Sequence, residues 1–220
     1  MKMKKVNQYL EQTVLTPTAT RGDMEQLVKE TIQYQFLGVC VPSFWVKKVK
    51  RDLRQFSTKV VAPIGFPLGY QHSEAKVAEA RQALTDGADE LDMVMNLSAF
   101  KSGDTHWPKV EIAQLSKLAH ENDAFLKVII ETAYLSKEEI ITTCKLCADA
   151  GADFVKTSTG FAPSGAQVED IRLMRTCLPD SVGIKASGGI KTYAQAVALI
   201  EAGADRIGTS SGVNIMNEAT

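Results

Sequence analysis

The chain has 220 residues, with 25 lysines and arginines against 26 aspartates and glutamates, so its net charge is −1 at pH 7. Hydrophobic residues make up 45% and charged residues 23%, close to the averages of globular domains. These values exclude a disordered, collagen-like or disulfide-scaffold protein. The balanced charge also provides no overall field that would attract nucleic acid or an anionic membrane.

The sequence predicts a soluble, cytoplasmic protein with no membrane partner. Polar Asn7 and Gln8 follow the N-terminal lysines, where a secretion signal needs an apolar core. No run of apolar residues approaches the ~18 needed to span a membrane. Four cysteines without a secretion signal indicate a reducing compartment.

Short apolar segments alternate with amphipathic segments along the whole chain. The predicted strands are residues 14–16, 38–41, 60–66, 91–96, 126–131, 154–159, 183–187 and 207–210. The predicted helices include residues 24–36, 73–85, 109–120, 137–150, 167–177 and 193–201, with a short helix at about residues 4–11 before the first strand.

A Gly-Ala-Asp motif recurs at residues 87–89, 151–153 and 203–205, each time between a helix and a strand. Glycine commonly ends a helix in the left-handed conformation. Alternating strands and helices predict parallel strands with right-handed crossovers. Eight such units fit one (β/α)₈ barrel domain over residues 1–220. An open doubly wound sheet is disfavoured because no Gly-x-Gly-x-x-Gly follows the first strand.

Four consecutive predicted strands carry charged residues, namely Asp92, Lys127, Lys156 and Lys185. Unpaired charges are costly inside a barrel, so either these lysines reach solvent from the strand ends or the four groups converge inside the mouth. A lysine crowded by another ammonium loses basicity and attacks carbonyl groups. A nearby carboxylate can then move protons. The convergent arrangement predicts Schiff-base chemistry without selecting the lysine.

Glycine-rich segments follow the seventh and eighth predicted strands, at Gly188-Gly189 and at Gly208-Thr209-Ser210-Ser211-Gly212, and each is expected to open a helix. Backbone N–H groups at such turns bind phosphate. The loops after strands seven and eight are the usual phosphate site of this barrel. We therefore expect a small phosphorylated ligand.

Several motifs resemble the deoxyribose-phosphate aldolase family of class I aldolases. They are Phe-Val-Lys-Thr-Ser-Thr-Gly at 154–160, Leu-Asp-Met-Val-Met-Asn at 91–96, Leu-Lys-Val-Ile-Ile-Glu-Thr at 126–132 and Gly-Ile-Lys-Ala-Ser-Gly-Gly-Ile at 183–190. The resemblance implies a (β/α)₈ barrel that reversibly cleaves 2-deoxy-D-ribose 5-phosphate to D-glyceraldehyde 3-phosphate and acetaldehyde, in deoxyribonucleotide catabolism and carbohydrate degradation. It also implies a lyase without metal or organic cofactor, assembled as a homodimer or homotetramer.

By this resemblance Lys156 forms the Schiff base, Lys185 lowers the pKa of Lys156, and Asp92 relays protons. The expected substrate and phosphate contacts are Glu11, Thr13, Cys40, Lys127, Thr157, Gly188, Gly189, Ser210 and Ser211.

Three positions depart from the family pattern. Glu11-Gln12-Thr13 stands where the family has Asp-His-Thr, Phe161 replaces a lysine that some members place near the phosphate, and Val41-Pro42-Ser43 lacks the usual asparagine. We expect these changes to tune affinity and leave the reaction intact.

Two other functions remain open from the residues alone. A phosphosugar isomerase would share the barrel and the phosphate loops but would need paired acid and base residues and no interior lysines. A non-catalytic barrel that binds a phosphosugar would not need a nucleophile. The isolated Cys144-x-x-Cys147 pair and the scattered histidines predict no metal site.

Overall fold

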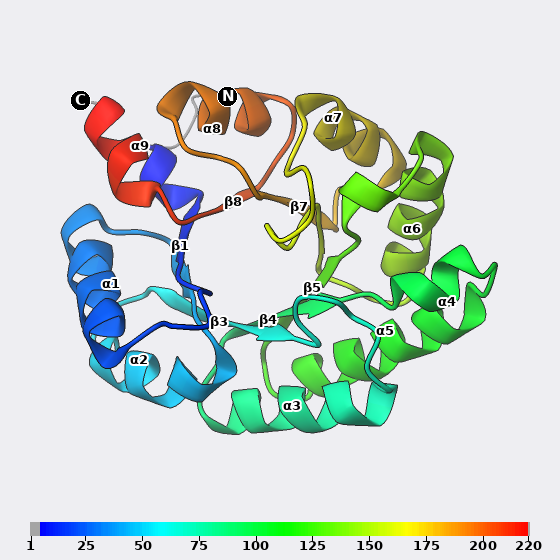
Figure 1. Ribbon diagram of the computed structural model, residues 1–220, viewed down its shortest axis with the longest axis horizontal. Helices are drawn as coiled ribbons and strands as arrows, with labels where there is room; N and C mark the ends of the chain where they lie inside the picture. Colours follow the sequence, from blue (N-terminus) through cyan, green and yellow to red (C-terminus); the bar gives the residue numbers. More distant parts are fainter. Residues whose placement is uncertain (1–4, 220) are drawn as a thin grey trace.

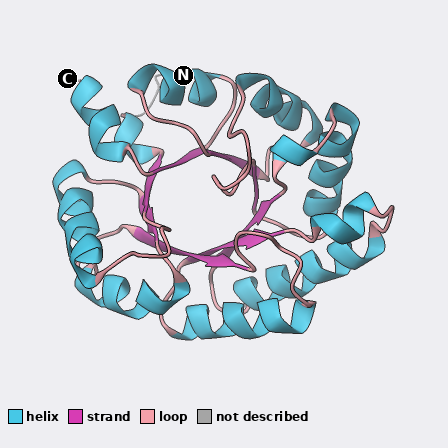
Figure 2. Cartoon of the chain, in the orientation of Figure 1, coloured by secondary structure: helices cyan, strands magenta, loops and turns pink. Residues whose placement is uncertain are grey.

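The computed structural model describes residues 5–219, and these form a closed barrel of eight parallel strands in chain order, ringed by helices (Figures 1 and 2). The predicted (β/α)₈ fold is confirmed. The strands are β1 (Leu10–Thr13), β2 (Gly38–Cys40), β3 (Lys59–Ile64), β4 (Glu90–Val94), β5 (Phe125–Ile129), β6 (Phe154–Lys156), β7 (Gly183–Ser187) and β8 (Arg206–Thr209).

The helices form the outer ring of the molecule (Figure 2). They are α1 (Arg21–Tyr34), α2 (Val46–Asp52), α3 (Ser73–Thr85), α4 (Leu97–Lys101), α5 (His106–His120), α6 (Lys137–Asp149), α7 (Val168–Cys177), α8 (Tyr193–Glu201) and α9 (Gly212–Glu218), with 3₁₀ turns η1 (Val6–Gln8), η2 (Ser43–Trp45) and η3 (Thr132–Tyr134). Thr20, Ser136 and Thr192 begin α1, α6 and α8 with capping boxes, which satisfy backbone N–H groups that have no partner within the helix.

The first strand lies earlier in the chain than the sequence predicted. Residues 14–16 form a loop, and the strand is β1 at Leu10–Thr13. The predicted helix at about residues 4–11 is also wrong within the described residues: a single 3₁₀ turn is present at Val6–Gln8, and residue 4 lies outside them. Unpaired charged and polar side chains are costly in a buried strand, but here both have partners: Glu11 enters the barrel and pairs with Lys185, and Gln12 accepts a hydrogen bond from the backbone of α9 at 2.9 Å.

The recurring Gly-Ala-Asp motif joins the strands in pairs. Its aspartate carboxylate accepts a backbone N–H bond from the preceding strand: Asp89 from Val60 at 2.9 Å, Asp153 from Leu126 at 2.8 Å, and Asp205 from Ile184 at 2.9 Å. The glycines have φ values of 99°, 85° and 117°, a region that only glycine adopts without strain. The motif therefore ends a helix and fixes the start of the next strand against its neighbour.

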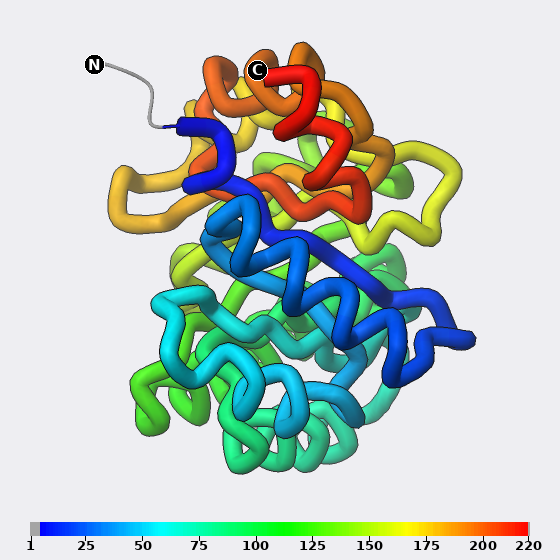
Figure 3. The backbone as a smooth tube through the Cα atoms, turned by 90° about the vertical axis from the view of Figure 1, so that its left-hand side faces the viewer, coloured from blue at the N-terminus to red at the C-terminus, as the bar shows by residue number. Residues whose placement is uncertain are grey.

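The apolar core lies between the barrel and its helices rather than inside the barrel mouth. Outward-facing residues of the strands, such as Val39, Leu91, Val128 and Ile184, are buried there against the helices. Alternate residues of each strand point inward. Figure 3 shows the blue N-terminal segment running beside the red C-terminal helix, where β1 pairs with β8 and closes the ring.

Candidate active site

Four ionisable side chains from β4 to β7 meet inside the barrel. Asp92 is in register with Lys127 on β5, and Lys156 is in register with Lys185 on β7. Each of the four residues is at most 4% exposed. The three lysines therefore do not extend into solvent from the strand ends, and the convergent arrangement is the one present.

Asp92 is the centre of this cluster. Its Oδ2 accepts hydrogen bonds from Nζ of Lys156 and from Nζ of Lys185, both at 2.7 Å. Its Oδ1 accepts one from Nζ of Lys127 at 2.9 Å. Lys185 also donates to Glu11, which links β7 to β1 inside the barrel. One carboxylate therefore holds three lysines that would otherwise repel one another.

Two further charged residues extend the cluster toward the amino ends of the strands. Nζ of Lys127 lies 2.5 Å from Oε2 of Glu90. The guanidinium of Arg206 lies 3.7 Å from carboxylate oxygens of both Glu11 and Glu90, and 5.4 Å from the centroid of the Phe154 ring. The sequence analysis missed Glu90 and Arg206. The two-residue period that places Asp92 inside the barrel also places Glu90 there, so this signal was available.

The cluster fixes the charge of most of its members. Burial alone would raise the pKa of Asp92, but the three lysines hold that pKa well below its usual range. Burial would lower the pKa values of Lys127 and Lys185, but Asp92 and Glu11 raise both above the ordinary lysine value. At neutral pH Asp92 is therefore ionised, and Lys127 and Lys185 are protonated.

A cavity of about 530 Å³ opens at the carboxyl ends of β1, β6, β7 and β8. The residues that line it are Thr13, Val14, Leu15, Thr16, Pro17, Lys156, Thr159, Gly160, Phe161, Ser187, Gly188, Gly189, Ile190, Lys191, Gly208, Thr209 and Ser210. Among the described residues, Lys156 is therefore the only one of the three clustered lysines at the cavity wall. Of the expected contacts, Thr13, Gly188, Gly189 and Ser210 line the cavity too.

The glycine turn after β7 has left-handed backbone at both glycines, and it does not open a helix directly, contrary to the sequence prediction. Gly188 and Gly189 have φ values of 85° and 75°, and α8 begins only at Tyr193, after the cap residue Thr192. The cavity wall also includes Lys191, a cation that the sequence analysis did not predict at this site.

The loop after β8 contributes one of its two serines to the cavity. Ser210 lines the wall, whereas Ser211 lies one residue further and donates its backbone N–H to Thr209 at 2.9 Å. The helix α9 begins at Gly212, as expected for the segment after the eighth strand. Of these two serines, Ser210 is therefore the one that lines the described cavity wall.

Besides Ser211, four expected contact residues lie outside the described lining of the cavity. Glu11 and Lys127 belong to the buried cluster beneath it. The Thr157 hydroxyl donates to the carbonyl of Ser187 at 3.2 Å and accepts from its N–H at 3.1 Å, so it joins β6 to β7. Cys40 is 1% exposed, and burial raises the pKa of its thiol to about 11.

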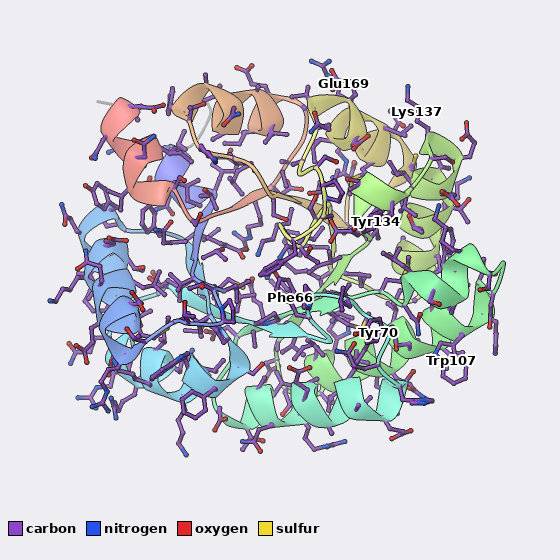
Figure 4. All side chains as sticks on the ribbon, viewed as in Figure 1. Phe66, Tyr70, Trp107, Tyr134, Lys137 and Glu169 are labelled. Atoms are coloured by element: carbon purple, nitrogen blue, oxygen red, sulfur yellow. The ribbon has the colours of Figure 1, made fainter. Side chains whose placement is uncertain are left out.

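The loops at the mouth are joined by contacts that the sequence did not predict. Glu131 has a left-handed backbone with φ of 50°, and its carboxylate accepts the N–H of Thr159 at 3.2 Å and the hydroxyl of the same residue. Burial raises the pKa of Glu131. Phe161 packs edge-to-face on Phe66, labelled in Figure 4, with ring centroids 5.3 Å apart. Phe161 therefore belongs to an aromatic pair.

No group of three or more histidine, cysteine, aspartate or glutamate side chains within residues 5–219 is arranged to hold a metal ion. Over the same range, every helix is too short or too polar to cross a membrane. Cys144 and Cys147 are buried free thiols on α6.

Comparison with known proteins identifies the family. The model of the DeoC/LacD family of aldolases matches residues 5–218. A deoxyribose-phosphate aldolase of Thermococcus gammatolerans is 54% identical over 97% of this chain and 96% of its own length. The solved structure of the aldolase QR15 is 42% identical with a TM-score of 0.93, covering 99% of this chain and 96% of that one. The tetrameric deoxyribose phosphate aldolase of Aeropyrum pernix is 33% identical with a TM-score of 0.91, covering 97% and 90%. This chain belongs to the DeoC/LacD family of aldolases.

Proposed function

We propose that this chain reversibly cleaves 2-deoxy-D-ribose 5-phosphate to D-glyceraldehyde 3-phosphate and acetaldehyde through a Schiff base on Lys156. The observation that carries the proposal is that Lys156 lines the cavity while its Nζ lies 2.7 Å from Asp92. A nucleophile must reach its substrate, and a proton carrier must reach the nucleophile. The activity named for the relative from Thermococcus gammatolerans supports the choice of sugar.

In the cleavage direction, the neutral amine of Lys156 attacks the C1 aldehyde carbon of the open-chain sugar. Asp92 carries a proton to the departing oxygen, and loss of water gives the protonated imine. The C2–C3 bond then breaks as the C3 hydroxyl loses its proton, which releases D-glyceraldehyde 3-phosphate and leaves an enamine on Lys156. Protonation at C2 and addition of water release acetaldehyde and restore the amine. Lys185 keeps its charge and disfavours a second ammonium beside it.

The phosphate of the substrate binds at the loops after β7 and β8 in this proposal. Gly188 and Gly189 present backbone close to the ligand. Ser210 supplies a hydroxyl, and the wall includes Lys191 as the positive charge that Phe161 does not provide. The proposal includes Thr13, at the end of β1, as a further substrate contact.

The proposal extends to the setting of the protein. Four free cysteines suit the reducing cytoplasm, where the reaction would serve deoxyribonucleotide catabolism. A homodimer or homotetramer is proposed, supported by the tetramer named for the Aeropyrum pernix relative. No metal or organic cofactor is required, because the amine and the carboxylate supply the nucleophile and the proton carrier.

Borohydride reduction in the presence of acetaldehyde, followed by peptide mass mapping, tests the proposal. We expect a reduced ethyl adduct on Lys156, together with turnover of 2-deoxyribose 5-phosphate in a coupled assay. The Lys156→Ala variant should lose both signals, and Lys145→Ala on the outer face of α6 is the matched control that should keep both.

Three outcomes would overturn parts of the proposal. An adduct on Lys127 or Lys185 would keep the aldolase chemistry but reassign the nucleophile. Full turnover by Lys156→Ala would contradict the mechanism. Absence of any site-specific adduct, with inorganic phosphate still bound, would favour the isomerase or the non-catalytic barrel.

A further inference from the structure

Two charged residues at the amino-terminal end of the barrel interior have no role in the proposed reaction. Glu90 and Arg206 both lie outside the described lining of the cavity. Glu90 is 1% exposed, and its carboxylate forms ion pairs with Lys127 at 2.5 Å and with Arg206 at 3.7 Å. A buried charge acts on neighbouring charged groups through its field, which the interior screens less than water does.

Seven charged residues form one continuous cluster through contacts of at most 3.8 Å. They are Glu11, Glu90, Asp92, Lys127, Lys156, Lys185 and Arg206. With three acids and four bases, the cluster carries a charge of +1 when every group is ionised and of zero when one lysine is neutral. A poorly solvated interior disfavours uncompensated charge, so the composition of the cluster favours one neutral amine.

Lys156 has fewer carboxylate partners than the other two lysines of the cluster. It contacts only Asp92 among the carboxylates of the cluster, whereas Lys185 contacts Asp92 and Glu11. Lys127 contacts Asp92 and Glu90 and lies 3.8 Å from Glu11.

Every element around Lys156 contributes to its electrostatic environment. The titratable or charged residues facing it are Glu11 on β1, Cys40 on β2, Glu90 and Asp92 on β4, Lys127 on β5, Glu131 after β5, Lys185 on β7, Lys191 after β7 and Arg206 on β8. From β3 the exposed first residue, Lys59, is added. Glu90 and Arg206 belong to the cluster but do not contact Lys156 and do not line the cavity. These two residues can be changed without touching the cavity.

We infer that Glu90 and Arg206 are positioning residues of opposite sign that set the pH at which Lys156 forms a Schiff base. Loss of the negative charge of Glu90 makes a protonated Lys156 less favourable, so the reaction begins at lower pH. Loss of the positive charge of Arg206 makes it more favourable, so the reaction begins at higher pH. The inference rests on the proposed function, because it assumes that Lys156 is the nucleophile.

The size of the effect follows from the chain of contacts. Glu90 reaches Lys156 through Lys127 and Asp92, which places the two charges within roughly 10 Å of each other. At an effective dielectric constant of about 20, a unit charge at that distance moves a titration midpoint by about one pH unit. The Arg206 side chain is 17% exposed, so we expect a smaller shift of opposite sign for its removal.

The test measures the rate of borohydride-trapped adduct formation with acetaldehyde as a function of pH. The variants are Glu90→Gln and Arg206→Gln, with Arg206→Lys as the charge-conserving rescue. Lys117→Gln and Glu121→Gln are matched controls, because this pair at the C-terminal end of α5 is exposed, its charged atoms lie 3.8 Å apart, and it is outside the barrel. Circular dichroism and the melting temperature establish that each variant is folded before its midpoint is compared.

We expect the midpoint to fall by about one pH unit in Glu90→Gln, to rise in Arg206→Gln, and to return in Arg206→Lys. The control variants should leave it within about 0.2 units, since exposed charges are screened. Unchanged midpoints in folded Glu90→Gln and Arg206→Gln, or shifts of the same sign, would overturn the inference and leave the aldolase standing. Absence of an adduct on Lys156 in the parent protein would instead overturn the proposed function. If Glu90→Gln does not fold, the rise of the midpoint in Arg206→Gln and its return in Arg206→Lys still test the inference.

Discussion

The replacement of Asp92 by asparagine is the sharpest test of the buried cluster, because it changes charge with almost no change in shape. The carboxylate accepts hydrogen bonds from three ammonium groups at 2.7, 2.7 and 2.9 Å. An amide has one accepting oxygen, and its nitrogen only donates. Whichever way the amide lies, at least one lysine then faces a donor instead of an acceptor.

The loss of unfolding free energy caused by Asp92→Asn at pH 7 can be estimated from the two ways in which a lysine can respond. Removing one partner of a buried ion pair costs about 3–5 kcal/mol when the other charge stays. A lysine that loses its partner can give up its proton instead, which costs about 4.6 kcal/mol at pH 7 for an ordinary lysine pKa of about 10.4. We therefore expect the free energy of unfolding to fall by about 3–5 kcal/mol.

The pH dependence of stability distinguishes a lysine that stays charged without its partner from one that gives up its proton. If a lysine is neutral in the folded variant and charged when unfolded, the unfolded state binds more protons, so stability rises with pH. The difference from the parent then shrinks by up to about 1.4 kcal/mol per pH unit between roughly pH 7 and pH 10. In the parent, Lys127 and Lys185 give no such gain, since their raised pKa values keep both protonated in this range.

Urea unfolding followed by circular dichroism at several pH values between about 7 and 9 measures both quantities. The exposed control Asp149→Asn, whose partner Lys109 lies 3.0 Å away on the surface, should lose less than about 1 kcal/mol. A loss of that small size in Asp92→Asn, or a loss that does not change with pH, would refute the view that this carboxylate neutralises the lysines.

Three further results are expected elsewhere in the molecule. Gly65→Ala should lower the free energy of unfolding by about 1–3 kcal/mol in urea titrations, because φ is 62° and the new Cβ would lie 2.8 Å from Cε of Lys76. In the control Gly103→Ala, φ is 86° but no atom lies within 4 Å of the new Cβ, so an equal loss there would contradict the role of the steric contact. Lys76→Met should lower the free energy of unfolding by about 3–5 kcal/mol, because it leaves the buried Glu111 without its ion-pair partner at 2.8 Å. In the same titration, the double variant with Glu111→Leu should recover most of that loss. Iodoacetamide at about pH 8 should leave Cys40 unmodified in the folded protein, since burial raises its pKa to about 11, and rapid labelling seen by mass spectrometry would contradict this.

The alternation of strands and helices was predictable because most strands are apolar and because a recurring glycine motif marks where helices end and strands begin. The Gly-Ala-Asp motif marks the starts of β4, β6 and β8, and the structure adds that its aspartate bonds to the preceding strand. Some predicted strands ran too long at their carboxyl ends, for example residues 154–159 against β6 at Phe154–Lys156. Thr157 and Ser158 remain buried beyond the strand end, so burial alone does not mark where pairing stops.

The parts of the site that escaped prediction are those whose meaning depends on three-dimensional partners. Glu11 and Gln12 lie before the predicted first strand at residues 14–16, yet Glu11 meets Lys185 across the closure of the barrel and Gln12 bonds to α9. Arg206 lies one residue before the predicted last strand at 207–210, whereas it is the first residue of β8 and pairs with Glu11 and Glu90. No local pattern records a pairing between residues so distant in the chain.

The ion pair between Lys185 and Glu11 joins residues 174 apart in sequence. It exists only when β1 has met β8 and the ring is complete. Contacts of such long sequence separation form late, because their loop-closure entropy is large. During refolding, regain of the trapped adduct should therefore lag behind regain of helical signal. Formation of the trapped adduct would then report that β1 has paired with β8 and that the barrel has closed.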